Sequence, residues 1–497
     1  MLKLRHAPKG TIQKIVSRFQ AQAPDDGGEP TDRSPDWEAM APFWHKVNDI
    51  VEGQDAIREA GQKYLPKFPN ESANDYEFRR ETAKFTNVYR DIIEGLSQKP
   101  FAKEVTLPDD TPDVLSELIE DIDGRGNHLN VFAADTFYAG INKAVDWILV
   151  DYANTEGLRT LEDERRAGVR PYWVHIPAER VVWIESQVIE GREQLTFVRI
   201  EESDTRVREF KRGQDQEGNP VVVWQTLQDP QKDGEPWEVV AEGDITIGVI
   251  PLVPFVTGRR KGAKWQFYPP MKDAADLQIE LYQQETALKY IKTMSAFPML
   301  AANGVEPQTK GDGTPKAIPV GPSAVLYAPP NADGNSGEWT WIEPSAETMK
   351  FLAEDVKETA RELRELGRQP LTANSANLTV ITTAFAAQKG NSAVQQWALL
   401  LKDALENALK LTAMWLNVDY RPQVTVFTDF GIEDNGDEVP RLLLDMRTPQ
   451  NAEPQISQLT LWEELKRRGI LSAEFDPEQE YENLLREIPG QDDPDSL

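Results

Sequence analysis

Apolar residues recur at helical spacing from Trp37 to Asp151. Between Trp37 and Val51 they fall three or four positions apart, and the same period returns in residues 76–96 and 114–122. Residues 130–151 are apolar enough for a buried helix that leads into a short strand at 147–151. This part of the chain is therefore predicted to be largely helical.

The period changes to two between Pro171 and Thr257, which is typical of half-buried strands. Strands are expected at 172–176, 181–184, 195–200, 221–224 and 249–256. The last of these contains Pro251 and Pro254, so it can only be an edge strand. The pattern predicts an α+β chain that is mainly α-helical, with a β-rich module at 171–257.

A helix, an irregular excursion and a second helix follow. Pro269 and Pro270 precede an apolar stripe that Pro298 ends, and about 26 residues at 1.5 Å each give roughly 39 Å. Residues 301–344 are rich in Gly, Pro and Asn, with short strands expected at 324–327 and 339–342. Residues 345–366 again show helical spacing.

The strongest helical stripe lies further on. Residues 367–390 are polar and small, and Asn391 and Ser392 are then expected to cap a long amphipathic helix. A strand is expected at 424–427, followed by acidic helices at 456–468 and 478–487. On pattern alone, a helical bundle with one long insertion fits this half of the chain equally well.

Residues 1–34 are rich in Pro, Gly and Asp towards their end and are expected to form a flexible arm. Their basic start lacks the apolar run of a secretory signal. No run of 18 apolar residues occurs, so no membrane span is expected. The absence of cysteine suits a reducing compartment and excludes disulfides and thiolate metal sites.

The formal net charge is −29, and residues 431–497 alone carry 17 acidic and 6 basic residues. A protein that grips DNA through its phosphates has the opposite balance. The charge either serves solubility or gives a DNA conduit a wall that repels the DNA backbone.

Motifs for catalysis are missing. The four histidines, His6, His45, His128 and His175, are far apart in the sequence, and no P-loop, Gly-x-Ser-x-Gly or dinucleotide fingerprint occurs. Asp121 to Gly126 resembles a calcium loop only faintly, and a glycine-terminated helix is the preferred interpretation. We therefore expect no enzymatic activity, no cofactor and no metal.

Several short motifs carry a resemblance to a known family. They are Tyr64-Leu-Pro66, Tyr76-Glu-Phe-Arg-Arg80, Phe85-Thr-Asn-Val88, Asp121-Ile-Asp-Gly124, Ala139-Gly140 before Ile148–Asp151, Asp276–Tyr290 ending at Phe297-Pro298, and Leu366-Gly367 to Trp415. None is diagnostic alone, but in this order and spacing the chain resembles the portal proteins of tailed phages, in particular the podophage-type portals, from Trp37 onward.

The resemblance implies a portal-like fold with wing, stem, clip and crown regions. Its parts would be a flexible arm at 1–34, a wing at 35–267, stem helices at 268–298 and 345–366, a clip at 299–344, a tunnel loop at 367–390, a tunnel helix with its following strand at 391–432, and an acidic helical crown at 433–497.

The resemblance also implies a function: a homo-oligomeric ring, usually of twelve subunits, at one capsid vertex of the virion, assembled in the host cytoplasm. Such a ring conducts double-stranded DNA during packaging and ejection without binding it tightly. Its partners are the major capsid and scaffolding proteins, the terminase, and then head–tail adaptor and tail proteins. The alternatives are another virion structural or adaptor protein and, less favoured, an acidic intracellular hydrolase.

On this assignment, small or basic side chains become candidates to face the channel. They are Lys289, Lys292, Lys310, Lys316, Arg368, Thr372, Asn374, Asn377, Thr379, Thr382 and Lys389. For each lysine, an ordinary solvated helix or loop face is the competing interpretation. Four residues are expected to pack the tunnel helix: Val394, Trp397, Leu401 and Leu405.

Overall fold

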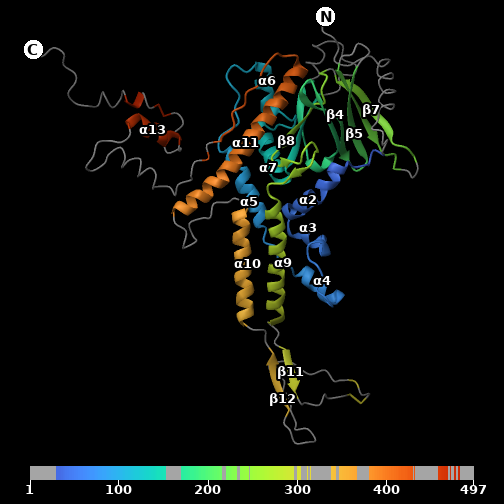
Figure 1. Ribbon diagram of the computed structural model, residues 1–497, viewed down its shortest axis with the longest axis vertical. Coiled ribbons are helices and arrows are strands. Elements are labelled where there is room, and N and C mark those ends of the chain that lie inside the picture. Colours follow the sequence, from blue (N-terminus) through green and yellow to red (C-terminus); the bar gives the residue numbers. More distant parts are fainter. Residues whose placement is uncertain are drawn as a thin grey trace, which may run out of the picture.

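The computed structural model contains a mixed α+β body from which one pair of helices projects (Figure 1). The structure describes residues 29–152, 169–214, 220–231, 235–245, 247–295, 299–303, 310–311, 314, 337–342, 346–366, 380–428, 430, 457–467, 471, 475–476 and 479–481.

Helices form the N-terminal half of the body. They are α2 (Pro35–Glu52), α3 (Gln54–Glu59), α4 (Ala73–Glu81), α5 (Val88–Ser97), α6 (Asp113–Leu118) and α7 (Leu129–Lys143). Ser34 caps α2 by accepting a hydrogen bond from the Trp37 amide at 3.1 Å, and Pro35 occupies the first helical position, where its missing N–H costs nothing.

A three-stranded antiparallel sheet lies at the centre of the body, in the order β2-β1-β8. Its strands are β1 (Val145–Tyr152), β2 (Pro171–Ile176) and β8 (Leu252–Val256). Both α7 and α11 (Val380–Leu416) pack against it. Gly140 lets α7 approach closely, because a Cβ there would lie 2.3 Å from the Phe255 ring.

A five-stranded antiparallel meander adjoins this centre. Its strands are β3 (Val181–Ile189), β4 (Arg192–Ser203), β5 (Arg206–Gln214), β6 (Pro220–Gln228) and β7 (Glu238–Ile245), in sequence order. A two-residue ladder joins β9 (Arg259–Arg260) to β10 (Phe267–Tyr268). The β-rich module expected at 171–257 is therefore split between two sheets.

The projecting part consists of α9 (Lys272–Ser295), a hairpin of β11 (Met299–Asn303) and β12 (Glu338–Ile342), and α10 (Ala346–Leu366). The two helices run side by side away from the body, and the hairpin lies beyond their far ends (Figure 1). The chain then returns to the body as α11. One further described helix, α13 (Gln458–Arg467), lies in the C-terminal region.

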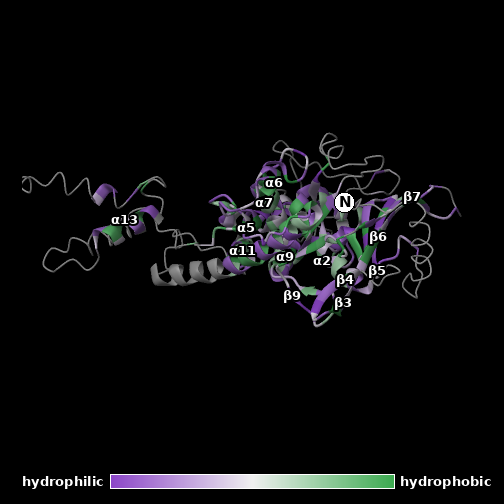
Figure 2. Cartoon of the chain, turned by 90° about the horizontal axis from the view of Figure 1, so that it is seen from above, coloured by the Kyte–Doolittle hydropathy of each residue, from purple (hydrophilic) through white to green (hydrophobic). Residues whose placement is uncertain are grey.

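One continuous hydrophobic core joins the helices α2, α5, α7, α9 and α11 to the central sheet. Seen from above, hydrophobic positions gather in the middle of the body, and hydrophilic ones dominate its margin (Figure 2). None of the described helices is long and apolar enough to cross a membrane.

Several elements differ from the sequence-based expectation. The helix expected at 76–96 is two helices, α4 and α5, separated at residues 82–87. The strand expected at 424–427 is a single bridge, in which Thr425 pairs with Thr106. Strands β5, β7, β9, β10 and β11 were not expected. The strand expected at 324–327 lies outside the described residues, as does most of the helix expected at 478–487.

The N-terminal boundary also differs. Residues 29–34, assigned above to the flexible arm, are held on the meander: the Ser34 amide donates to the Val182 carbonyl at 2.9 Å. Arg33 pairs with Glu201 at 2.8 Å. Residues 1–28 lie outside the described part of the chain.

Candidate functional site

The projecting helix pair is the feature that most distinguishes this fold from an ordinary helical body. The first part of α9 is buried in the body. Its buried face carries Ala274, Gln278, Leu281, Glu285 and Leu288. These positions recur at three and four residues, so one stripe of the helix enters the body over its first four turns. Beyond Leu288 the described residues are partly or fully exposed.

Two polar residues lie within that buried stripe. Gln278 is fully buried; its Oε1 accepts from the Tyr89 amide at 2.9 Å and its Nε2 donates to the Thr86 carbonyl at 3.0 Å. Together these bonds fasten α9 to the chain segment that starts α5. Sequence reasoning missed this role, although a glutamine inside an apolar stripe is the signal that could have shown it.

Glu285 is the second polar anchor, at 6% exposure. Its carboxylate accepts from the Thr86 amide at 2.9 Å, from the Thr86 hydroxyl at 2.7 Å and from the Lys84 ammonium at 2.7 Å. A buried carboxylate is stable only with such donors. These bonds draw residues 84–86 onto α9, which explains why the helix expected at 76–96 is interrupted there.

The second helix is tied to the body over its second half, where Val356 and Ala360 pack against the core. Leu363 is fully buried, and Arg364 pairs with Asp91 of α5 at 2.9 Å. Near the start of α10, by contrast, Phe351 is 68% exposed. The distal halves of α9 and α10 therefore support each other and stand clear of the body.

The hairpin lies at the far end of the pair. Its antiparallel register pairs Met299 with Ile342 and Asn303 with Glu338. Both strands thus start or end close to a helix end, so the hairpin continues the line of α9 and α10 (Figure 1).

The helix α11 begins earlier than expected. It runs from Val380 to Leu416, whereas Asn391 and Ser392 were expected to cap its start. Residues 380–389 include three alanines and continue the helix without a break. A capping residue or one glycine, Gly390, lowers helix stability but does not end a helix that is held by packing further along. The polar loop expected at 367–390 therefore reaches at most to residue 379.

The packing face of α11 is anchored in the core. Val394, Leu401 and Leu405 are fully buried, and Trp397 is 3% exposed. Near its end, the Trp415 indole donates to the Val150 carbonyl of β1 at 3.2 Å. Leu399, on the opposite face, is 49% exposed.

The candidate channel residues are not brought together by the described structure. Lys289 and Lys292 are exposed on the distal half of α9, and Lys310 is exposed beyond β11. Thr382 and Lys389 lie on the first turns of α11. The others lie outside the described residues: Lys316, Arg368, Thr372, Asn374, Asn377 and Thr379. Their assignment to a channel stays a prediction.

In the loop that faintly resembles a calcium site, hydrogen-bond donors of the chain itself bind the two carboxylates. Asp121 accepts from the Gly126 amide at 2.6 Å and pairs with Arg170 at 2.5 Å. Asp123 accepts from the Arg125 amide and the Asn127 side chain. Burial by itself would raise the pKa of Asp123, but these hydrogen bonds lower it below its usual value. Across the described residues, no group of three acidic or histidine side chains could hold a metal ion.

One histidine has a buried partner. His175 on β2 contacts the carboxylate of Asp146 on β1, which is fully buried. Burial by itself lowers the pKa of His175, but the hydrogen bond and charge of Asp146 outweigh it, so the pKa lies above its ordinary value. Burial raises the pKa of Asp146. Lys143, Glu179 and Asp135 also act on this pair electrostatically.

Comparisons with known proteins point to the projecting region. Residues 270–416 match a family model described as a domain of unknown function, DUF4055. The match begins just before α9 and ends at the last residue of α11, so it takes in the helix pair, the hairpin and the helix that returns to the body. No curated protein matches the chain.

Two of the solved structures that match the chain are particle necks. One is described as the neck of a native GTA particle computed with C12 symmetry: TM-score 0.39, 13% identity, covering 78% of this chain and 87% of that one. Another is the neck of an empty GTA particle computed with C6 symmetry: TM-score 0.40, 12% identity, covering 84% and 95%.

Proposed function

We propose that this chain is a portal subunit, which assembles into a closed ring and forms a conduit for double-stranded DNA at one vertex of a tailed-phage capsid. The observation that carries the proposal is the pair α9 and α10, rooted in the body at one end and capped by a hairpin at the other. The sequence resemblance described above implies the same arrangement of stem and clip.

In this proposal the regions of the chain have separate tasks. The body from α2 to β10 is the wing, α9 and α10 are the stem, and β11–β12 belongs to the clip. The segment before Val380 is the tunnel loop, α11 is the tunnel helix, and the acidic C-terminal region is the crown. The ring has about twelve copies, in keeping with the family that the sequence resembles.

A stem of this kind suits assembly. Two helices that pack mainly on each other expose both flanks, and twelve such pairs arranged around an axis can bury those flanks against their neighbours. Phe351, at 68% exposure on α10, is a large apolar side chain that a neighbouring subunit would cover.

The proposed role is mechanical and not enzymatic. The ring nucleates procapsid assembly with capsid and scaffolding proteins. It then docks the terminase at the clip and later binds head–tail adaptor and tail proteins there. With a net charge of −29 per chain, the conduit lets DNA slide instead of holding its phosphates.

Mass photometry of the purified chain at about 1 µM tests the assembly directly. The proposal predicts a species whose mass is a multiple of 56.1 kDa, near twelve copies, that survives a change from low to moderate salt. A chain that remains a 56.1 kDa monomer under both conditions contradicts it. Rings of several sizes would not contradict the proposal.

A further inference from the structure

The meander has two faces, and only one belongs to the main core. Val198, Phe210 and Val222 pack on that core. Side chains alternate along a strand, so the neighbouring positions lie on the opposite side, which we call the outer face. The outer face is defined by two rows that run across the sheet in register. They are Glu185, Phe197, Lys211, Val223 and Asp244, and Trp183, Arg199, Glu209, Gln225 and Glu242.

The centre of the outer face is buried although it is turned away from the core, whereas Glu242 at its margin is exposed. Phe197 is 4% exposed and Val223 is 8% exposed, and with Trp183 they form a second, separate apolar cluster. Arg199 and Glu209 pair at 2.7 Å with both side chains below 10% exposure. Something therefore covers this sheet face.

Two buried polar atoms on β4 lack a hydrogen-bond partner: Gln194 Oε1 and the hydroxyl oxygen of Thr196. Gln194 precedes Leu195, which packs on the core, so it points to the outer side. Buried acceptors are normally paired. Gln194 Oε1 accordingly calls for a donor from whatever covers the face.

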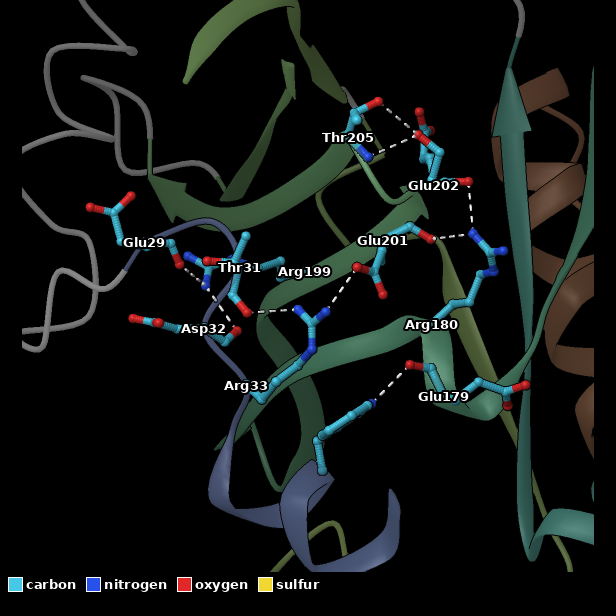
Figure 3. A network of polar contacts seen from close by, with 12 residues as sticks. Glu29, Thr31, Asp32, Arg33, Glu179, Arg180, Arg199, Glu201, Glu202 and Thr205 are labelled. Atoms are coloured by element: carbon cyan, nitrogen blue, oxygen red, sulfur yellow. Dashed lines mark hydrogen bonds and ion pairs between the residues drawn. The ribbon is translucent and has the colours of Figure 1, made fainter. Parts of the chain in front are cut away.

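The described chain begins on this same face. Arg199 donates to the carbonyls of Glu29 at 3.1 Å and Asp32 at 3.4 Å, and Arg33 pairs with Glu201. Figure 3 shows these residues lying along the strands of the meander. Beside them, Arg180 donates hydrogen bonds to the carbonyls of Glu201 and Glu202. The 28 residues before Glu29 therefore leave from the outer face itself.

Those residues have a chemistry that complements the face. They carry five basic side chains and no acidic one before Asp25; the five are Lys3, Arg5, Lys9, Lys14 and Arg18. Apolar side chains stand at Ile12, Ile15, Val16 and Phe19, a spacing that would share one side of a helix. The outer face offers an apolar cluster with carboxylates around it, among them Glu185 and Glu242, beside the cations Lys211 and Arg199.

We propose that residues 1–28 dock on the outer face of the meander of their own chain. The apolar side chains around Ile15 contact Trp183, Phe197 and Val223, and Lys14 and Arg18 pair with the surrounding carboxylates. Five strands span about 19 Å, and 28 extended residues reach about 90 Å, so the length suffices. Attachment at Glu29 gives the segment an effective concentration of about millimolar at its own sheet.

Single-cysteine labelling tests this proposal cleanly, because the chain contains no cysteine. In Val223→Cys, a maleimide should react about tenfold or more slowly in the full-length chain than in a chain lacking residues 1–28. The matched control is Val188→Cys on β3, which is 75% exposed and should react equally fast in both chains. Equal rates at residue 223 overturn the proposal.

A second variant keeps the chain length. Lys14→Glu with Arg18→Glu in the full-length Val223→Cys protein should raise the labelling rate towards that of the shortened chain. An unchanged rate contradicts the proposed pairing. Protection that disappears when the protein is diluted would place the segment on another copy and overturn docking on its own sheet. The proposal stands whether or not the chain forms a ring.

Discussion

Gln278 and Glu285 are the residues through which the projecting helix is held at a fixed angle to the body. Apolar contacts alone would allow α9 to slide along its axis, whereas bonds to the amides of Tyr89 and Thr86 have fixed partners and lengths. Buried, paired polar groups are a common source of such specificity. Both sit on the side of α9 that meets the start of α5.

Glu285→Ala should lower the free energy of unfolding by about 2–3 kcal/mol, because it removes three accepted hydrogen bonds and leaves the Thr86 amide without its partner. Chemical denaturation followed by tryptophan fluorescence measures this. Glu280→Ala, at an exposed position of the same helix, is the matched control and should change stability by less than about 0.5 kcal/mol. Equal effects of the two variants would show that Glu285 is no anchor.

The His175–Asp146 pair predicts a pH dependence of stability. The folded chain binds the proton of His175 more tightly than the unfolded chain, because its pKa is raised. The resulting stabilisation is complete below the unfolded-state pKa, about 6.5, and is lost as pH rises through the folded-state pKa. The raised pKa of Asp146 acts in the same direction.

Unfolding measured from pH 6 to pH 9 tests this. The stability advantage of the parent chain over His175→Gln should shrink as the pH rises. His45→Gln, at an exposed histidine, should follow the parent profile. A constant difference between the parent and His175→Gln at all pH values would be the contrary result.

Elements with a clear hydrophobic period were predictable, and those set by distant contacts were not. The stripes of α2 and α10 are strong, prolines frame α9, and the bounds of all three helices fall within a few residues of the expected ones. Strand β5 (Arg206–Gln214) was missed because it carries four basic residues, of which Arg208 pairs with Asp151 of β1 and Glu202 of β4. The break between α4 and α5 depends on Glu285, which lies some 200 positions away in the sequence.

The candidate site was likewise predictable only in part. The order helix, excursion, helix and the burial of the α11 packing face follow from apolar spacing alone. The anchors of α9 do not, because a glutamine and a glutamate become buried only when another part of the chain supplies their donors. The early start of α11 at Val380 was hidden by Gly390, Asn391 and Ser392, which are typical of helix ends but tolerated inside a helix.

At the scale of this helix, buried volume decides stability. Leu401→Ala should cost about 2–5 kcal/mol and Trp397→Ala about 3–5 kcal/mol, because both side chains fill the core between α11 and the sheet. Leu399→Ala, on the exposed face of α11, is the control and should cost less than about 0.5 kcal/mol. Thermal and chemical unfolding measure all three. A Leu401 variant as stable as the Leu399 variant would contradict this packing.

The whole molecule combines one continuous core with a part that stands outside it. The body buries its helices and central sheet together, while the distal halves of α9 and α10 and the hairpin reach beyond the body. A projecting pair of this length makes sense in an assembly, where neighbours cover the flanks that one chain leaves exposed.

The overall charge predicts weak contact with DNA. At about 0.15 M salt, duplex DNA should bind the purified chain more weakly than about 1 µM, because −29 charges per chain repel phosphates. Fluorescence anisotropy with a labelled duplex over a salt series measures this. Nanomolar affinity that falls steeply with salt would contradict the sliding conduit.

Electron microscopy of the purified chain tests the central claim most directly. The portal proposal predicts class averages that show a closed ring with a central hole, and side views in which the helix pairs gather into a stalk below a wider body. Isolated single chains, open filaments, or closed particles without a hole would contradict it.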